Sequence, residues 1–251
     1  MSAEHAFTFG HAGAPLVGVL HEPDKIVGSR GVVVVVGGPQ YRGGSHRQFV
    51  LLARSLAARG VPVLRFDQSG CGDSAGDAGG FESLDGDLRA AIDELLRRDP
   101  RVDRLILLNP WVRSEGSLAQ AYLDNYYRRR LRNPAFWRKM LTNPFAAARA
   151  ALGYADNRRD SARAATAQAP SFVERMLDGA RAFRGRTLVV LSGADTVAAE
   201  FAALIERDAG WHKAFSGTGV TTLALADANH TFSRREWRDR VAERSAEFVL
   251  G

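Results

Sequence analysis

The stretch Gly31-Val-Val-Val-Val-Val-Gly-Gly-Pro-Gln-Tyr41 decides the fold class. Five consecutive valines are typical of a strand that is buried on both faces of a parallel sheet. The glycines that follow let the backbone turn sharply and leave N–H groups directed at a ligand oxygen. An ordinary tight turn is the alternative interpretation of these glycines. The stretch therefore predicts a central strand over residues 32–36, with a loop at the carboxyl edge where open α/β sheets bind ligands.

Strand and helix patterns alternate on both sides of this stretch. Apolar spacing of the helical kind separates short apolar runs, which is the arrangement of repeated strand–helix–strand units. The sequence therefore predicts an α/β fold, a mostly parallel sheet flanked by helices, in which the strand at 105–108 lies beside the one at 32–36. The other predicted strands cover 6–9, 16–21, 61–66, 187–191 and 221–226, and the predicted helices 45–59, 85–98, 198–207 and 235–250.

The segment from residue 112 to 186 has no strand pattern and an unusual charge. It holds 15 Lys or Arg and 6 Asp or Glu, a balance of +9, whereas the rest of the chain has a balance of −3. We therefore expect one core in two parts, 1–111 and 186–251, interrupted by a helical cap insertion over 112–185 with helices near 118–132, 134–141, 145–152 and 172–183. Basic residues of the insertion are expected partly over the mouth of a pocket, where they would attract an anionic substrate; they are Arg113, Arg128, Arg129, Arg130, Arg132, Arg138 and Lys139.

Composition excludes several classes of protein. With 45% hydrophobic and 25% charged residues in 251, the chain is that of a folded globular protein. A single cysteine forms no intramolecular disulfide, and no Cys/His group has zinc spacing, so neither a metal nor a cofactor is expected. The longest apolar run is too short to cross a bilayer and no signal peptide is evident, so a cytoplasmic protein without membrane insertion is expected. The sequence has no nucleic-acid-binding motif, and the Arg-rich insertion is the only feature that suggests nucleic-acid binding. We interpret its basic residues as a solvated face instead.

An acid and a histidine follow two late strands. Asp195 comes after the strand at 187–191, and His230 after the strand at 221–226. Neighbouring parallel strands end at one edge of a sheet, so we expect the carboxylate to face one imidazole nitrogen within hydrogen-bonding reach. A helix cap for Asp195 and a structural role for His230 are the alternatives for each residue alone.

The order acid then histidine calls for a nucleophile earlier in the chain. Gly72-Asp-Ser-Ala-Gly76 matches the G-x-S-x-G pattern of a nucleophile elbow. An elbow needs a strand directly before the serine and a helix directly after it, and the glycines here prevent a helix from beginning at Ser74. We therefore interpret the match at Ser74 as coincidental and do not expect Ser74 to be the nucleophile. Cys71, in the same loop, is no better a candidate for the nucleophile.

Several segments taken together resemble an α/β-hydrolase family over nearly the whole chain, the exosortase A system-associated hydrolase 1 family. The resemblance implies an ester or thioester hydrolase acting on a small acyl or anionic substrate, linked to exopolysaccharide and exosortase systems. It implies that Asp195 is the acid, that His230 is the base, and that backbone N–H groups near Gly38 and Gln40 form an oxyanion hole. The segments are Gly37-Gly-Pro-Gln-Tyr-Arg42, Gly44-Ser-His-Arg-Gln-Phe49, Arg65-Phe-Asp67, Gly72-Asp-Ser74, Leu107-Leu-Asn-Pro-Trp-Val-Arg113 and His230-Thr-Phe-Ser233.

One departure from that family bears on activity. Its members have a further strand, the nucleophile elbow and its helix between the segments that correspond to the helix at 85–98 and the strand at 105–108. In this chain, residues 95–102 connect the predicted helix directly to the predicted strand. The resemblance therefore implies that one strand–helix unit of about 25–30 residues is absent. The chain is therefore expected to be nearly inert as a covalent acyl hydrolase; a non-catalytic binding protein of the same fold, or a deletion product, is the alternative.

Overall fold

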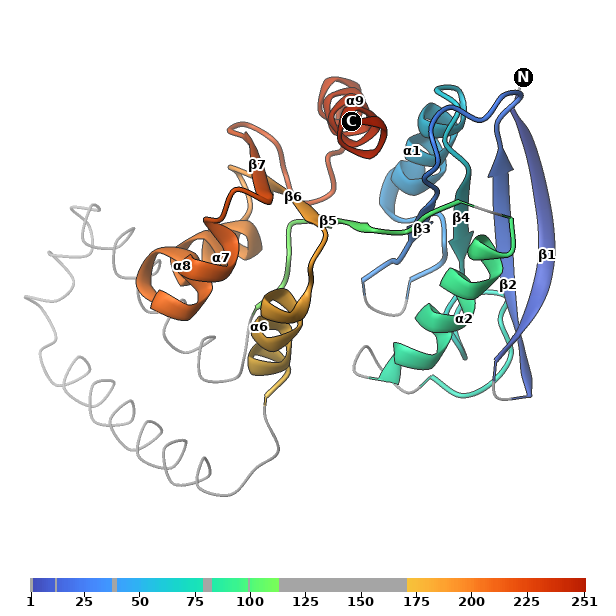
Figure 1. Ribbon diagram of the computed structural model, residues 1–251, viewed down its shortest axis with the longest axis horizontal. Coiled ribbons are helices and arrows are strands. Elements are labelled where there is room, and N and C mark those ends of the chain that lie inside the picture. The colour runs from blue at the N-terminus through green and yellow to red at the C-terminus, as the bar shows by residue number, and fades with distance from the viewer. Residues whose placement is uncertain (1, 12, 38–39, 79–82, 99, 113–170) are drawn as a thin grey trace, which may run out of the picture. The chain divides into compact units, whose positions relative to one another are not determined.

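The computed structural model describes residues 2–11, 13–37, 40–78, 83–98, 100–112 and 171–251 (Figure 1). The chain divides into two compact units. The first unit comprises residues 1–110, 184–199 and 215–251, and the second 111–183 and 200–214. The seven basic residues predicted over a pocket mouth, the first three predicted cap helices and Gly38 lie outside the described residues.

The first unit contains two β-sheets. A four-stranded sheet has the order β1-β2-β4-β3, in which β1, β2 and β4 pair antiparallel and β3 pairs parallel with β4. A three-stranded sheet has the order β5-β6-β7 and is parallel throughout. The strands are β1 (Ala3–His11), β2 (Ala14–Glu22), β3 (Val32–Val34), β4 (Val63–Phe66), β5 (Arg104–Leu108), β6 (Arg186–Ser192) and β7 (Val220–Leu225).

Helices alternate with these strands as the sequence predicts, which confirms an α/β fold. A 3₁₀ turn precedes α1, and α8 is a short helix that the sequence pattern did not indicate. The 3₁₀ turn is η1 (Ser45–Arg47), and the helices are α1 (Gln48–Ala57), α2 (Asp85–Leu96), α6 (Phe172–Ala182), α7 (Thr196–Arg207), α8 (Ala209–Phe215) and α9 (Arg235–Leu250). None of the described helices is long and apolar enough to cross a membrane.

Helix α9 packs against elements of both sheets. Its Ala246 and Val249 belong to a buried cluster with α1, β3 and β4, while its Val241 and Phe248 belong to a second cluster with β6. Ile106 of β5 packs against both clusters. The carbonyl groups of the last turn of α9 also accept hydrogen bonds from arginine side chains at the amino ends of the strands, including the 3.2 Å bond from Arg30 to Val249. The two sheets therefore share one helix on one face.

The prediction that residues 32–36 form a central strand was wrong. Strand β3 covers only Val32–Val34 and lies at the end of its sheet, and Val35 is 41% exposed. Strands β2 and β4 have the interior positions instead, and all four residues of β4 are buried. A run of valines indicates a strand that can be buried on both faces of a sheet. It does not specify which strands pair with it on either side.

The prediction that the strand at 105–108 lies beside the valine strand was also wrong. Strand β5 pairs with β6, and the described residues contain only one bridge between the two runs, from Arg30 to Arg101. Backbone groups in a strand point alternately to its two sides. Arg101 bonds Ser29 and Gly31 across the bridge, yet Asn109 donates to Val190 of β6 at 3.0 Å, which means the alternation shifts between residues 101 and 104. Among the described residues, the bridge does not continue into a ladder between β3 and β5.

The second unit is partly described and is mainly helical there. Helix α6 begins with a capping box, in which Ser171 accepts from the Glu174 amide and Glu174 accepts from the Ser171 amide. Trp111 stacks on Phe172 with 5.3 Å between ring centroids, and Phe201 meets Trp211 edge-on at 5.8 Å. Helix α6 confirms the helix predicted over residues 172–183.

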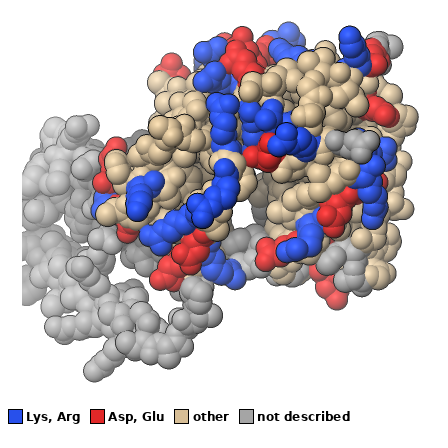
Figure 2. All heavy atoms as spheres, viewed as in Figure 1, with Lys and Arg blue, Asp and Glu red and all other residues tan. Residues whose placement is uncertain are grey.

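Charged side chains of both signs are interspersed over the face of the described residues that Figure 2 shows. On α9 they form pairs three residues apart, Arg240 with Glu243 and Arg244 with Glu247, each at 2.7 Å. Such exposed pairs contribute little to stability, up to about 1 kcal/mol each.

Candidate active site

Asp195 follows β6 in a tight turn that is attached to the neighbouring strand. The Gly193 amide donates to the Leu225 carbonyl at 2.8 Å, and the Ala194 amide donates to the Ala228 carbonyl at 3.0 Å. A Cβ atom at position 193 would collide with the Ala226 carbonyl, so only glycine fits this close approach. The turn thereby brings Asp195 to the loop that follows β7.

The Asp195 carboxylate is held by the first turn of α7. Its two oxygens accept from the Val197 and Ala198 amides, each at 3.2 Å, which is the geometry of a helix N-cap. The side chain is only 7% exposed. Capping, the alternative weighed for this residue, is therefore part of its role, and it fixes the carboxylate in one orientation.

The expected contact between Asp195 and His230 is present. Nδ1 of His230 lies 2.8 Å from Oδ2 of Asp195, and the histidine side chain is 57% exposed. A carboxylate only accepts hydrogen bonds, so Nδ1 carries the proton and Nε2 of the neutral ring is the basic nitrogen. The pair thus combines a buried, fixed carboxylate with an accessible imidazole, which is the arrangement of a general base and its orienting group.

Asn109 is a residue of this site that the sequence did not single out. Its side-chain NH₂ donates to Ser192 Oγ and to the His230 carbonyl, both at 2.9 Å, and its oxygen accepts from the Ser192 amide at 2.8 Å. The residue is buried and has a left-handed backbone with φ of 47°. Asparagine tolerates that conformation better than most residues, and its position just after β5, before Pro110, was the available signal.

The loop that carries His230 has further internal support. Asn229 donates to Ser233 Oγ at 2.7 Å and accepts from the Ser233 amide at 3.0 Å, and its carbonyl accepts from Ser192 Oγ at 2.9 Å. Phe232, two residues after the histidine, is buried. The imidazole is exposed while the backbone beneath it is held from three sides, by β5, β6 and its own turn.

Ser74 has a different environment from a nucleophile. Its Oγ donates to the Asp67 carbonyl at 2.7 Å and accepts from the Val17 amide at 2.8 Å, so the hydroxyl joins β2 to the end of β4. Strand β4 ends eight residues earlier, at Phe66, and the next helix, α2, begins at Asp85. These contacts agree with the interpretation of Ser74 as a structural residue rather than an elbow.

Comparison with solved structures settles the fold. An esterase of Pyrococcus furiosus superposes with a TM-score of 0.58 at 16% identity, covering 100% of this chain and 92% of its own. An α/β serine hydrolase without a lid from Xanthomonas campestris gives 0.53 at 17% identity, covering 99% and 96%. The chain has the α/β-hydrolase fold. An esterase of Exiguobacterium antarcticum gives 0.57 at 14% identity, covering 98% and 100%; no protein-family model and no curated protein sequence matches the chain.

In this α/β-hydrolase fold, the loop after β3 is anchored to the loop after β4. The Arg42 amide donates to Asp67 at 2.6 Å, and the Arg42 guanidinium pairs with Asp67 and, at 2.8 Å, with Asp73. Gln40, one of the two predicted oxyanion-hole residues, is exposed just before this anchor, and Gly38 lies outside the described residues. Within the described ranges, no group of three or more His, Cys, Asp or Glu is placed to hold a metal ion.

Proposed function

We propose that this chain carries the acid–base part of an acyl-hydrolase site. His230 is the general base and Asp195 orients its imidazole, and the observation that carries this proposal is the 2.8 Å contact between a fixed, buried carboxylate and an exposed ring. Its substrate is a small ester or thioester, including anionic ones. The sequence resemblance further supports a link to exopolysaccharide and exosortase systems.

The remaining parts of the proposed site come from the sequence. Backbone N–H groups at Gly38 and Gln40 serve as the oxyanion hole, because a glycine-rich loop after a strand of the sheet can present such groups to a developing negative charge. Residues 112–185 form the cap of the site. The core parts are then 1–111 and 186–251.

The chemistry of this site proceeds through water rather than through a covalent enzyme intermediate. Ser74 uses its hydroxyl to join β2 and β4, and the sequence contains no other nucleophile elbow. Nε2 of His230 takes a proton from a water molecule as its oxygen bonds the acyl carbon. The bond to the alcohol or thiol then breaks, and the leaving group receives that proton from the imidazolium. Without the two-step covalent route, turnover is slow.

Hydrolysis of p-nitrophenyl acetate tests this proposal. We expect slow release of nitrophenol without a burst, and a fall of about 10²-fold in His230→Ala, which is the usual contribution of a general base. Ser74→Ala and Cys71→Ser are the matched controls and should keep the wild-type rate. A fluorophosphonate or thiol-reactive probe should label none of these proteins stoichiometrically.

Two outcomes would contradict the proposal. Equal rates in wild type and His230→Ala would leave the chain as a non-catalytic binding protein of this fold. Stoichiometric labelling of Ser74 or Cys71 that depends on His230 would instead show that the glycine-rich loop supplies a covalent nucleophile. Peptide mapping of the labelled protein distinguishes the two residues.

A further inference from the structure

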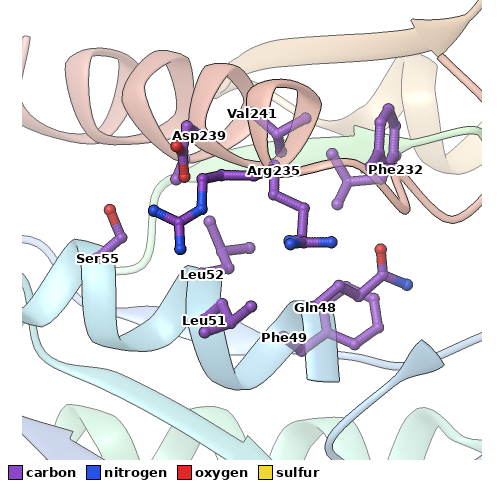
Figure 3. Close-up of a pocket in the computed structure, with 12 residues that line it drawn as sticks. Gln48, Phe49, Leu51, Leu52, Ser55, Phe232, Arg235, Asp239 and Val241 are labelled. Carbon is purple, nitrogen blue, oxygen red and sulfur yellow. The ribbon is translucent and has the colours of Figure 1, made fainter. Parts of the chain in front are cut away.

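A pocket of about 190 Å³ lies between α1 and α9 (Figure 3). Its apolar lining comes from α1, from the carboxyl end of β5, from the loop that carries His230 and from α9. Polar and charged side chains of the two helices also line it. The apolar residues are Phe49, Leu51, Leu52, Leu108, Phe232, Val241 and Ala242, and the polar ones are Gln48, Ser55, Arg235, Arg238 and Asp239.

The pocket has the size of a small hydrophobic ligand. An engineered cavity of about 150 Å³ with Leu, Ile and Phe walls binds benzene in another protein, so 190 Å³ holds a body of about six carbon atoms. Leu108, the last residue of β5, is half-buried and contributes to the pocket wall.

The charges at the pocket favour an anion. Arg235 and Arg238 of α9 line it, against a single carboxylate, Asp239. Figure 3 shows the Arg235 side chain extending from α9 toward α1, over the apolar lining. Arg238 uses one nitrogen to donate to the Ser233 carbonyl, which leaves Arg235 as the cation best placed to meet a ligand.

We propose that this pocket binds a small organic anion, an aliphatic or aromatic carboxylate with an apolar body of about six carbon atoms. The body lies against Leu52, Leu108 and Val241, and the carboxylate pairs with Arg235. Burial of the apolar body supplies most of the affinity, since an exposed ion pair alone contributes little. The proposal uses neither Asp195 nor His230, so it stands or falls independently of the proposed hydrolase.

Hexanoate titrated into the full-length protein tests the proposal, with methyl NMR signals of leucine and valine as the readout. We expect saturable shifts at Leu52 and Val241, and the same shifts in His230→Ala. Hexanol, which has the tail without the charge, and acetate, which has the charge without the tail, should both bind more weakly. Added salt should weaken hexanoate binding and leave hexanol unaffected.

Three substitutions distinguish this site from general hydrophobic binding. Arg235→Gln should weaken hexanoate binding about fivefold, the upper range for an exposed ion pair. Asp239→Asn should strengthen it, because it removes the one carboxylate that repels the ligand. Ala242→Leu should abolish binding by filling the pocket. Arg244→Gln, on the same helix but paired with Glu247 outside the pocket, is the control and should change nothing.

Clear results would overturn the proposal. Hexanoate binding that is unchanged in both Arg235→Gln and Ala242→Leu places the ligand elsewhere. Equal affinity for hexanol and hexanoate rejects an anionic ligand. Absence of saturable shifts at the α1 and α9 methyl groups, in a wild-type protein whose thermal unfolding is cooperative, rejects the pocket itself.

Discussion

Two aspartates, Asp67 and Asp195, follow buried strands of this molecule and yet have different partners. Asp67 is fully buried after β4, and its oxygens accept from the Arg42 and Asp73 amides and from the Arg42 guanidinium. Asp195 is nearly buried after β6, and its oxygens accept from two amides of α7 and from an exposed imidazole. A permanent cation holds the first carboxylate, and a titratable base holds the second.

The difference shows that a strand-end position does not by itself identify a functional acid. An arginine stays protonated at any ordinary pH, so the Asp67–Arg42 pair can only hold two loops together. An imidazole nitrogen can accept a proton and release it again, so the carboxylate at Asp195 can support proton transfer by orienting His230. Stability should therefore depend on the first aspartate and activity on the second.

Replacing each aspartate with asparagine should separate these roles. Asp67→Asn leaves the Arg42 guanidinium without its buried counter-ion, and we expect a loss of about 3–5 kcal/mol in the free energy of unfolding. Asp195→Asn keeps a good N-cap and should cost at most about 1 kcal/mol, while ester hydrolysis falls. Urea unfolding gives the first quantity and p-nitrophenyl acetate turnover the second. Similar losses of stability in the two variants would contradict this contrast.

His21 of β2 differs from the exposed His230 in the same way, because it is buried and its partner is an arginine. His21 is fully buried on β2 and accepts from Arg65 Nε at 2.8 Å; burial, and then the Arg65 charge, lowers its pKa from 6.5 to about 4. Between those values the unfolded chain takes up a proton that the folded ring refuses. Stability should therefore be complete above pH 6.5 and fall by about 3 kcal/mol as the pH drops to 4.

Urea unfolding of wild type and His21→Gln at pH 7 and pH 4.5 checks this. Glutamine keeps an acceptor for Arg65 but does not titrate, so the part of the acid-dependent loss that belongs to His21 should disappear. An unchanged slope in His21→Gln would place the acid sensitivity elsewhere.

Asn109 lies in the Asp195–His230 site, and its replacement should cost less stability than that of Asp67. Asn109→Ala leaves the Ser192 amide and the His230 carbonyl without their side-chain partner, at a cost of about 2 kcal/mol. If Asn109 positions His230, the Asn109→Ala variant should have a lower kcat for ester hydrolysis and nearly the same KM. A variant that loses stability but keeps kcat would show that Asn109 supports the loop without positioning His230.

Sequence patterns predicted elements and strand-end residues well because both depend on local information. The seven strands and most helices lie within a few residues of their predicted ranges, and the Asp195–His230 contact follows from two neighbouring strand ends. Short α8 was missed, since seven residues that include Gly210 give little periodicity.

The failures concern relations between distant segments. Strand β3 pairs with β4 and strand β5 with β6, and such pairing between distant segments is not encoded in the side-chain pattern of either segment. Asn109 acts through partners 83 and 121 residues away, so its place after β5 marked it as a candidate but could not show which groups it bonds. The basic residues expected near a pocket mouth stay a prediction, because they lie outside the described residues.

Helix α9 has a consequence for how the protein is made. The ribosome synthesises it after every strand, so the α1 side of the four-stranded sheet and the β6 side of the other remain uncovered until Arg235–Leu250 leaves the exit tunnel. Until then the nascent chain exposes that apolar surface, and chaperone binding and aggregation compete with folding. Completion of the core therefore waits for these sixteen residues, which bring no catalytic group.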